Sequence, residues 1–288
     1  LRITSLNLDG ITAGSISRDL SYMKNLSYFT CMNSNIEEID FTGLEKLVEI
    51  DLTGSALKSV KFSGLKNLVK LTLGKTLVTD VDVSECVQLV SIDYAGSPVA
   101  NIKFPEKSKI IYVDCSNTGF TGFTDENIAC LEGLLYLEAA DNTGLGSIDL
   151  SRLPALKKVN LTNCGLGSIT FANCKELYYA KCSNNNFTEV DLSNSEAISY
   201  FEAYSNVLKT VYVTGKSKDD IAAVYVYDTV QVTGWKEDVN VVPENGATGT
   251  GDVNINQQPG TEQNDVIQDP NGVVPPVNPG VPAENTTN

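Results

Sequence analysis

The sequence predicts a solenoid of roughly ten turns, in which every turn adds one short strand to a parallel sheet. Three observations lead to this fold class: a repeat of about 21 residues, apolar residues at fixed places within each repeat, and a polar residue at a fixed bend. Repeats of this length are typical of solenoids, because one unit can bury its apolar side only against its neighbours.

The repeat is clearest in the middle of the chain. Residues 47–67 read LVEIDLTGSALKSVKFSGLKN and are followed directly by LVKLTLGKTLVTDVDVSECVQ and LVSIDYAGSPVANIKFPEKSK, a period of 21. On this pattern units begin at Ile3, Leu26, Leu47, Leu68, Leu89, Ile110, Leu134, Leu156, Leu177, Ile198 and, more loosely, Ile221.

Each unit places apolar residues first, fourth and sixth, as in Leu47, Ile50 and Leu52, so alternate side chains of a short strand point into the coil. A second apolar pair, such as Val60 and Phe62, follows on the return limb. About ten residues remain for that limb, which favours extended or single-turn structure over a full helix.

The ninth place of most units is small and polar, and a side chain turned inward there would satisfy backbone groups where the chain bends. The residues that occupy it are Ser34, Ser55, Thr76, Ser97, Thr118, Asn142, Asn185 and Asn206, with Ile11 and Cys164 as departures.

This pattern resembles the leucine-rich-repeat family, L-x-x-L-x-L-x-x-N-x-L, and units such as LYYAKCSNNNFTEVDLSNSEA look like the 21-residue repeats of bacterial surface proteins. Cys31, Cys115 and Cys182 stand at the sixth place, as in internalin J-like proteins, although other units have leucine there. The resemblance implies a leucine-rich-repeat solenoid, a right-handed superhelix, with its strands on a concave surface, and a non-catalytic bacterial protein of the cell surface.

Composition narrows the function. A formal charge of -15 would repel nucleic acid and anionic membranes, and no apolar run is long enough to span a bilayer. Histidine is absent, which removes the commonest general base and metal ligand, and the seven cysteines form no C-x-x-C pair. We therefore expect no enzyme, no cofactor and no metal site, and we interpret the cysteines as small buried hydrophobic residues.

Two segments depart from the regular units. Residues 124–133, TDENIACLEG, are typical of a short amphipathic helix capped by Thr124, and a tolerated loop insertion explains this irregularity better than a functional bulge does. The single tryptophan, Trp235, could close the C-terminal end of the coil.

After the repeats the composition changes, because seven of the ten prolines lie between Pro243 and Pro282. We predict two parts, a repeat domain over residues 1–236 and a flexible Pro/Gly/Asn-rich tail over residues 237–288 that spaces it from an anchor. The first residues, Leu1-Arg2-Ile3, contain no methionine or hydrophobic signal core, so we expect a processed piece of a longer precursor, with its signal peptide and anchor outside this sequence.

The third, fifth and seventh places of each unit point away from the coil, and we call the surface that they form the concave face. Eight of the twelve tyrosines occupy these places, and seven of the eight lie from the sixth unit onward. They are Tyr28, Tyr112, Tyr136, Tyr179, Tyr200, Tyr204, Tyr225 and Tyr227.

Charged residues share this surface. Seven acids lie there against three lysines, so a cationic region on a partner is favoured. They are Asp9, Glu49, Asp51, Asp93, Asp114, Glu138 and Glu202, with Lys70, Lys158 and Lys181. For the acids alone, an ordinary solvated surface is the better explanation, and the neighbours Asp93 and Asp114 could instead hold calcium weakly.

Tyrosine also favours strands for structural reasons, but it is a common residue of binding surfaces because it is rigid, apolar and carries a hydroxyl. We therefore predict binding on the concave face through Tyr112, Asp114, Tyr136, Glu138, Tyr179, Lys181, Tyr200, Glu202, Tyr204, Tyr225 and Tyr227. A protein partner on a host or neighbouring cell is the first hypothesis; a carbohydrate stacked on the tyrosines and a purely structural stalk are the alternatives.

Overall fold

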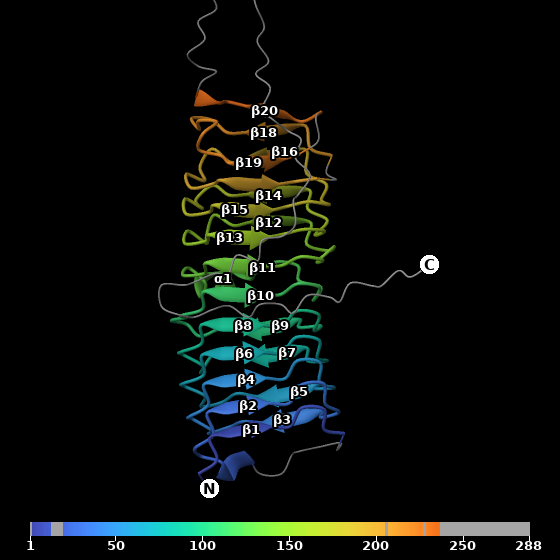
Figure 1. Ribbon diagram of the computed structural model, residues 1–288, viewed down its shortest axis with the longest axis vertical. Helices are drawn as coiled ribbons and strands as arrows, with labels where there is room; N and C mark the ends of the chain where they lie inside the picture. Colours follow the sequence, from blue (N-terminus) through green and yellow to red (C-terminus); the bar gives the residue numbers. More distant parts are fainter. Residues whose placement is uncertain (1, 13–19, 205–206, 227–228, 237–288) are drawn as a thin grey trace, which may run out of the picture. The chain divides into compact units, whose positions relative to one another are not determined.

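The computed structural model describes residues 2–12, 20–204, 207–226 and 229–236. These residues form a solenoid whose successive turns stack on one another (Figure 1). Asn206, Tyr227 and residues 237–288, for which the sequence makes predictions, lie outside the described residues.

One parallel sheet of eleven strands runs along the solenoid, with one strand from each predicted unit. In sheet order its strands are β1 (Ser5–Asn7), β2 (Tyr28–Thr30), β4 (Glu49–Asp51), β6 (Lys70–Thr72), β8 (Ser91–Asp93), β10 (Tyr112–Asp114), β11 (Tyr136–Glu138), β13 (Lys158–Asn160), β15 (Tyr179–Lys181), β17 (Tyr200–Glu202) and β19 (Ala223–Tyr225). Each strand begins two residues after a predicted unit start, so the repeat register is confirmed.

The return limbs carry shorter parallel sheets, which confirms that they are extended. Their strands are β3 (Glu38–Asp40) with β5 (Ser59–Lys61), β7 (Asp80–Asp82) with β9 (Asn101–Lys103), β12 (Ser147–Asp149) with β14 (Ser168–Thr170), and β16 (Glu189–Asp191), β18 (Thr210–Tyr212) and β20 (Gln231–Thr233). Helical structure in the described residues is limited to a 3-10 turn, η1 (Leu20–Tyr22), and one helix, α1 (Asp125–Ala129).

The helix α1 forms at the start of the segment where it was predicted. The Thr124 side chain accepts a hydrogen bond from the Asn127 backbone N–H at 3.2 Å, as an N-cap does. Asp125 in the first turn forms an ion pair with Arg152 of a later unit, so the helix is held against the solenoid. Shallow pockets of about 300 Å³ flank it.

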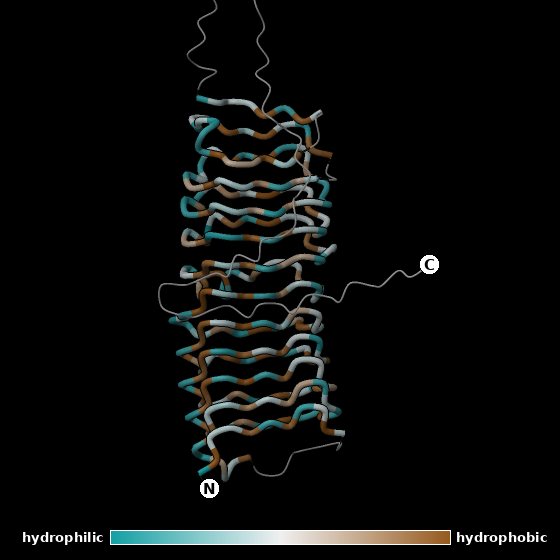
Figure 2. Tube along the Cα trace, viewed as in Figure 1, coloured by the Kyte–Doolittle hydropathy of each residue, from teal (hydrophilic) through white to brown (hydrophobic). Residues whose placement is uncertain are grey.

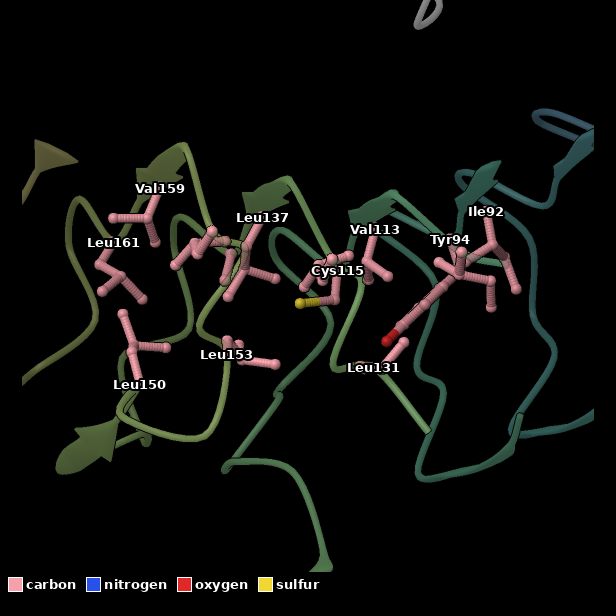
Figure 3. Packing of buried hydrophobic residues seen from close by; sticks show 14 of the residues in the cluster. Ile92, Tyr94, Val113, Cys115, Leu131, Leu137, Leu150, Leu153, Val159 and Leu161 are labelled. Atoms are coloured by element: carbon pink, nitrogen blue, oxygen red, sulfur yellow. The ribbon is translucent and has the colours of Figure 1, made fainter. Parts of the chain in front are cut away.

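The core lies between the two sets of strands and continues from turn to turn. Figure 3 shows Ile92, Val113, Leu137 and Val159, the fourth residues of four successive units, pointing into the same interior. Hydrophobic and hydrophilic residues alternate along the strands (Figure 2), as a strand with one buried side requires. Trp235 is buried against the last turn, as the sequence predicts.

The cysteines behave as buried hydrophobic residues. All seven are free, and all except Cys130 at the end of α1 are buried. The sixth-place residue Tyr94 is also buried, and its hydroxyl points into the core (Figure 3). Burial raises the pKa of Tyr94 far above its usual value, with the adjacent Cys115 thiol as its hydrogen-bonding neighbour.

The polar residues at the ninth place turn inward, as predicted, and their hydrogen bonds recur along the solenoid as a ladder. The side-chain amide of Asn185 donates to the carbonyl oxygens of Leu161 and Cys182 at 2.7 and 2.9 Å. Its Oδ1 accepts from the backbone N–H groups of Cys164 and Leu166, both at 3.0 Å. Cys164, a departure in sequence, also takes part, because its thiol donates to the Ala139 carbonyl at 3.1 Å. Ser97, Asn142, Cys164 and Asn185 therefore tie one turn to its neighbour, whereas the hydroxyls of Ser34 and Ser55 donate to carbonyls of their own turn.

Candidate functional site

The predicted site residues on the concave face fall into two groups, separated by β13. The acidic patch comprises the predicted residues Tyr112, Asp114, Tyr136 and Glu138 on β10 and β11, and the structure adds Ser91 and Asp93 on β8. The aromatic cluster comprises Tyr179, Lys181, Tyr200, Glu202, Tyr204 and Tyr225 around β15, β17 and β19. Lys158 and Asn160 of β13 occupy the concave places between the two groups, a division that could have been read from the repeat register.

The tyrosines of the aromatic cluster pack on one another. Tyr179 and Tyr200 are opposite in the parallel register, and their rings stack with centroids 4.3 Å apart and an interplanar angle of 11°. The ring centroid of Tyr225 lies 5.2 Å from that of Tyr200 and 6.2 Å from that of Tyr204, and the rings are tilted relative to each other. All four side chains are half-buried, so the cluster is a preformed layer and not a set of independent side chains.

Two lysines approach the outer ring of this layer. The Nζ atoms of Lys158 and Lys181 lie 5.5 and 5.9 Å from the Tyr179 centroid, within the range of a cation–π interaction. Tyr179 therefore has Tyr200 stacked against its ring and two ammonium groups beside it.

Glu202 fixes the centre of the aromatic cluster. Its Oε2 accepts from the Tyr200 hydroxyl and its Oε1 accepts from the Ser183 hydroxyl, both at 2.8 Å. The Ser183 oxygen in turn accepts from the Tyr204 backbone N–H at 3.1 Å. Burial, reinforced by the hydrogen bond to Glu202, raises the pKa of Tyr200 well above its usual value, so the hydroxyl stays protonated.

The acidic patch places three carboxylates side by side. The strand register sets Asp93 opposite Asp114, and Asp114 opposite Glu138. Burial raises the pKa of Asp93 to about 6, helped by the charge of Asp114 and opposed by the Ala95 N–H. Burial also raises the pKa of Asp114 and of Glu138, against hydrogen bonds from Ser116 and Tyr112 to the first and from Asn160 to the second.

The aspartates also have a structural role that the sequence analysis missed. Oδ1 of Asp93 accepts from the Ala95 N–H, and Oδ1 of Asp114 accepts from the Ser116 N–H, both at 2.9 Å. These bonds close Asx-type turns at the strand ends. The same bond recurs at Asp40, Asp51, Asp82, Asp149, Asn160 and Asp191. A recurring Asp/Asn-x-Ser/Thr in the sequence is the signal that could have revealed it.

Within the described residues, no group of three or more histidine, cysteine, aspartate or glutamate side chains is arranged to hold a metal ion. The described part of the chain also contains no helix with the length and hydrophobicity needed to cross a bilayer.

No protein-family model matches the chain, and no curated protein matches it. Solved structures do. A leucine-rich-repeat protein of Leptospira interrogans aligns with a TM-score of 0.58 at 18% identity over 71% of this chain, which spans 55% of that protein. An internalin of Listeria monocytogenes aligns with a TM-score of 0.50 at 14% identity over 80% of this chain and 82% of its own.

A third neighbour is the leucine-rich-repeat domain of APL1, with a TM-score of 0.57 at 14% identity over 77% of this chain and 67% of that domain. At such identities the likeness concerns the fold alone. Together with the eleven-stranded parallel sheet, it identifies the fold of this chain as a leucine-rich-repeat solenoid, a fold that it shares with bacterial proteins.

Proposed function

We propose that this chain is a non-catalytic binding module of the bacterial cell surface or exterior that recognises a protein partner through the concave face between Tyr112 and Tyr225. The observation that carries the proposal is the aromatic cluster, in which four tyrosines and two charged residues form an ordered layer on an otherwise regular sheet. Ordered tyrosines bind well because little side-chain entropy is lost on association.

The size of the concave face supports a protein as the partner. The eleven strands of the sheet, at about 4.8 Å per strand, make a face about 50 Å long, which is long enough to carry one side of a standard protein interface of about 800 Å². The strands β10, β11, β15 and β17 each carry a tyrosine at the third place and a charged residue at the fifth, and tyrosine is enriched in protein interfaces.

The ring geometry argues against a carbohydrate partner. A sugar stacks on the open face of an aromatic ring, but Tyr179 and Tyr200 cover each other, and lysines approach Tyr179. The ring edges remain for contact, which suits packing against the side chains of a polypeptide.

The stalk alternative also has structural support, since cross-strand tyrosine pairs stabilise a sheet without any ligand. An extracellular site is supported by the resemblance to bacterial surface proteins and by the proline-rich composition of residues 237–288. Six of the seven thiols are buried, so their presence is compatible with an oxidising exterior.

The test is a binding screen against cell-surface proteins and glycans with the wild-type chain and a Tyr136→Ala, Tyr179→Ala, Tyr200→Ala variant. We expect a protein that binds the wild type and is lost by the triple variant. The matched control is a Tyr22→Ala, Tyr212→Ala variant, because these side chains are 72% and 38% exposed and lie off the concave face.

Binding that persists in the triple variant would place the interface elsewhere and leave the stalk as the better hypothesis. A ligand that is a small oligosaccharide, and that is lost by the triple variant alone, would establish the carbohydrate alternative instead.

A further inference from the structure

We propose that the acidic patch on β8, β10 and β11 receives an arginine or lysine side chain of the protein partner. This inference rests on the proposed function, since it names the chemistry that the partner brings to the concave face. It concerns residues that the aromatic cluster does not include.

Asp93, Asp114 and Glu138 are neighbours in the strand register. The carboxylates of the acidic patch have lysines in their surroundings, Lys70 near Asp93 and Lys158 and Lys181 near Glu138, but no lysine or arginine of the described residues forms a close ion pair with them. On the next strand pair along the same face, by contrast, Glu49 is paired with Lys70 at 2.8 Å. Adjacent like charges on a sheet are unfavourable, and a cation between them removes the repulsion.

The carboxylates keep acceptor capacity for a ligand. The Asx-type turns occupy Oδ1 of Asp93 and Oδ1 of Asp114, at 2.9 Å each. Oδ2 of Asp93 makes no hydrogen bond with the described residues, although a carboxylate can accept several. The turns also hold both side chains in one orientation, so little ordering is needed when a donor arrives.

Ser91 gives a second, independent indication of a ligand. Its side chain shares the concave face with Asp93, two residues away, and the residue is 3% exposed. Its Oγ has no hydrogen-bond partner in the described part of the chain. A buried hydroxyl without a partner is unfavourable by roughly 1–3 kcal/mol, and such groups are rare in folded proteins. A donor seated against Asp93 would satisfy it.

A cationic side chain fits better than other cations. The described carboxylates are not arranged to hold a metal ion, and Ca²⁺ or Mg²⁺ would need at least six oxygen ligands. Residues 237–288 contain eight acidic residues and no lysine or arginine, so this chain's own tail has the wrong charge. A guanidinium group offers five donors to carboxylates and can lie on a tyrosine ring such as Tyr112.

The experiment compares the full chain with an Asp93→Asn, Asp114→Asn variant, using a fluorescent hexa-arginine peptide as the probe at pH 7.5. Asparagine keeps the turn, because Asn160 makes the same bond to the Thr162 N–H at 3.2 Å. We expect the variant to bind about tenfold more weakly, as for removal of close charge pairs. The control, Glu38→Gln, Glu189→Gln, removes the same charge from exposed strands of the return limbs.

Equal weakening in the variant and the control would show that the peptide responds only to net charge and would overturn the proposal. A Ser91→Ala variant adds a separate readout. We expect it to fold with unchanged or greater stability and to bind the probe about threefold more weakly, because a new hydrogen bond is lost. Unchanged binding would mean that Ser91 is not part of the subsite and would count against it.

The two proposals fail in different ways. A surface protein that is lost by the tyrosine variant but bound equally by Asp93→Asn, Asp114→Asn would support the proposed function and overturn this inference. A probe that needs the carboxylates, with no surface protein found in the screen, would support the cationic subsite and leave the tyrosines unsupported as an interface.

Discussion

A single asparagine, Asn185, holds four backbone groups in the interior of the solenoid. Replacing it by alanine leaves two N–H groups and two carbonyls buried without this partner, so we expect Asn185→Ala to lower the free energy of unfolding by about 3 kcal/mol. Urea unfolding measures this loss. Asn186→Ala is the control, since Asn186 is exposed, and a similar loss there would contradict the ladder argument.

Asp93 carries a stability cost at neutral pH. Its folded-state pKa is about 6 against an ordinary value of 3.8, so its charge opposes folding above pH 6, and this cost is relieved as the pH falls from 6 towards 4. The charged groups that face it are Asp51, Lys70 and Asp114. We expect Asp93→Asn to raise the melting temperature at pH 7.5 and to differ little from wild type near pH 4.5.

Thermal unfolding of both proteins across this pH range checks the prediction. The Glu189→Gln variant serves as the control, because Glu189 is exposed on β16. A melting-temperature difference for Asp93→Asn that does not change with pH would show that Asp93 is not protonated in this range.

Lys75 sits in a backbone conformation that suits glycine. It has φ of 57°, in the eighth place of its unit, where Gly54 and Gly96 have φ of 70° and 71°. We expect Lys75→Gly to increase the free energy of unfolding by about 1 kcal/mol, because a side chain at positive φ is strained. The same substitution at Lys66, outside these positions, should not stabilise; stabilisation at both sites would point to charge and not to backbone strain.

At the scale of elements, the strands were predictable and the turns were predictable only in part. The apolar residues at the first, fourth and sixth places predicted every strand of the eleven-stranded sheet, because a strand with one buried side needs apolar residues at alternate positions. The backbone has positive φ at Asn33, Asn117, Asn163 and Asn184, each directly before a ninth-place residue. Asparagine and glycine tolerate this conformation, so their recurrence at the eighth place could have predicted the turn.

The candidate site was predictable as a set of places, but the contacts between its side chains were not. Because side chains alternate between the two sides of a strand, Tyr179 and Tyr200 lie on the same side of the sheet, and the parallel pairing of their strands makes them neighbours. The two rings stack, and the Tyr200 hydroxyl donates a hydrogen bond to Glu202. Both contacts depend on side-chain rotamers, which the spacing of residues in the sequence does not determine. The burial of Asp93 and Ser91 depends in the same way on how neighbouring side chains lie.

The helix α1 is short, and its cap is therefore important to it. We expect Thr124→Ala to destabilise the protein by about 1 kcal/mol, because the Asn127 N–H loses its acceptor, whereas Thr124→Ser keeps the acceptor and most of the stability. Equilibrium unfolding of both variants measures the difference. Equal loss in the two would assign the effect to the methyl group of Thr124 and not to capping.

At the scale of the molecule, each turn is stabilised mainly by its neighbours. Backbone bonds, ladder residues and ion pairs such as Lys58–Glu37 join residues about one repeat apart, so stability is close to a sum over adjacent turns. An interior turn packs against two neighbours, whereas an end turn packs against one. The buried residues that cover the last described turn therefore contribute strongly to the stability of the solenoid, although they are few. Buried Trp235, on the last described turn, is such a residue.

This arrangement predicts where the folded domain ends. We propose that residues 1–236 fold without the tail, so a chain ending at Lys236 should unfold at the same temperature as the full chain. A chain ending at Gly215 loses Ile221, Val226, Val230 and Trp235, which are buried, and uncovers the apolar interior of the preceding turn. It should melt at least several degrees lower, by circular dichroism. A lower melting temperature for the chain ending at Lys236 would show instead that the proline-rich segment contributes to the fold.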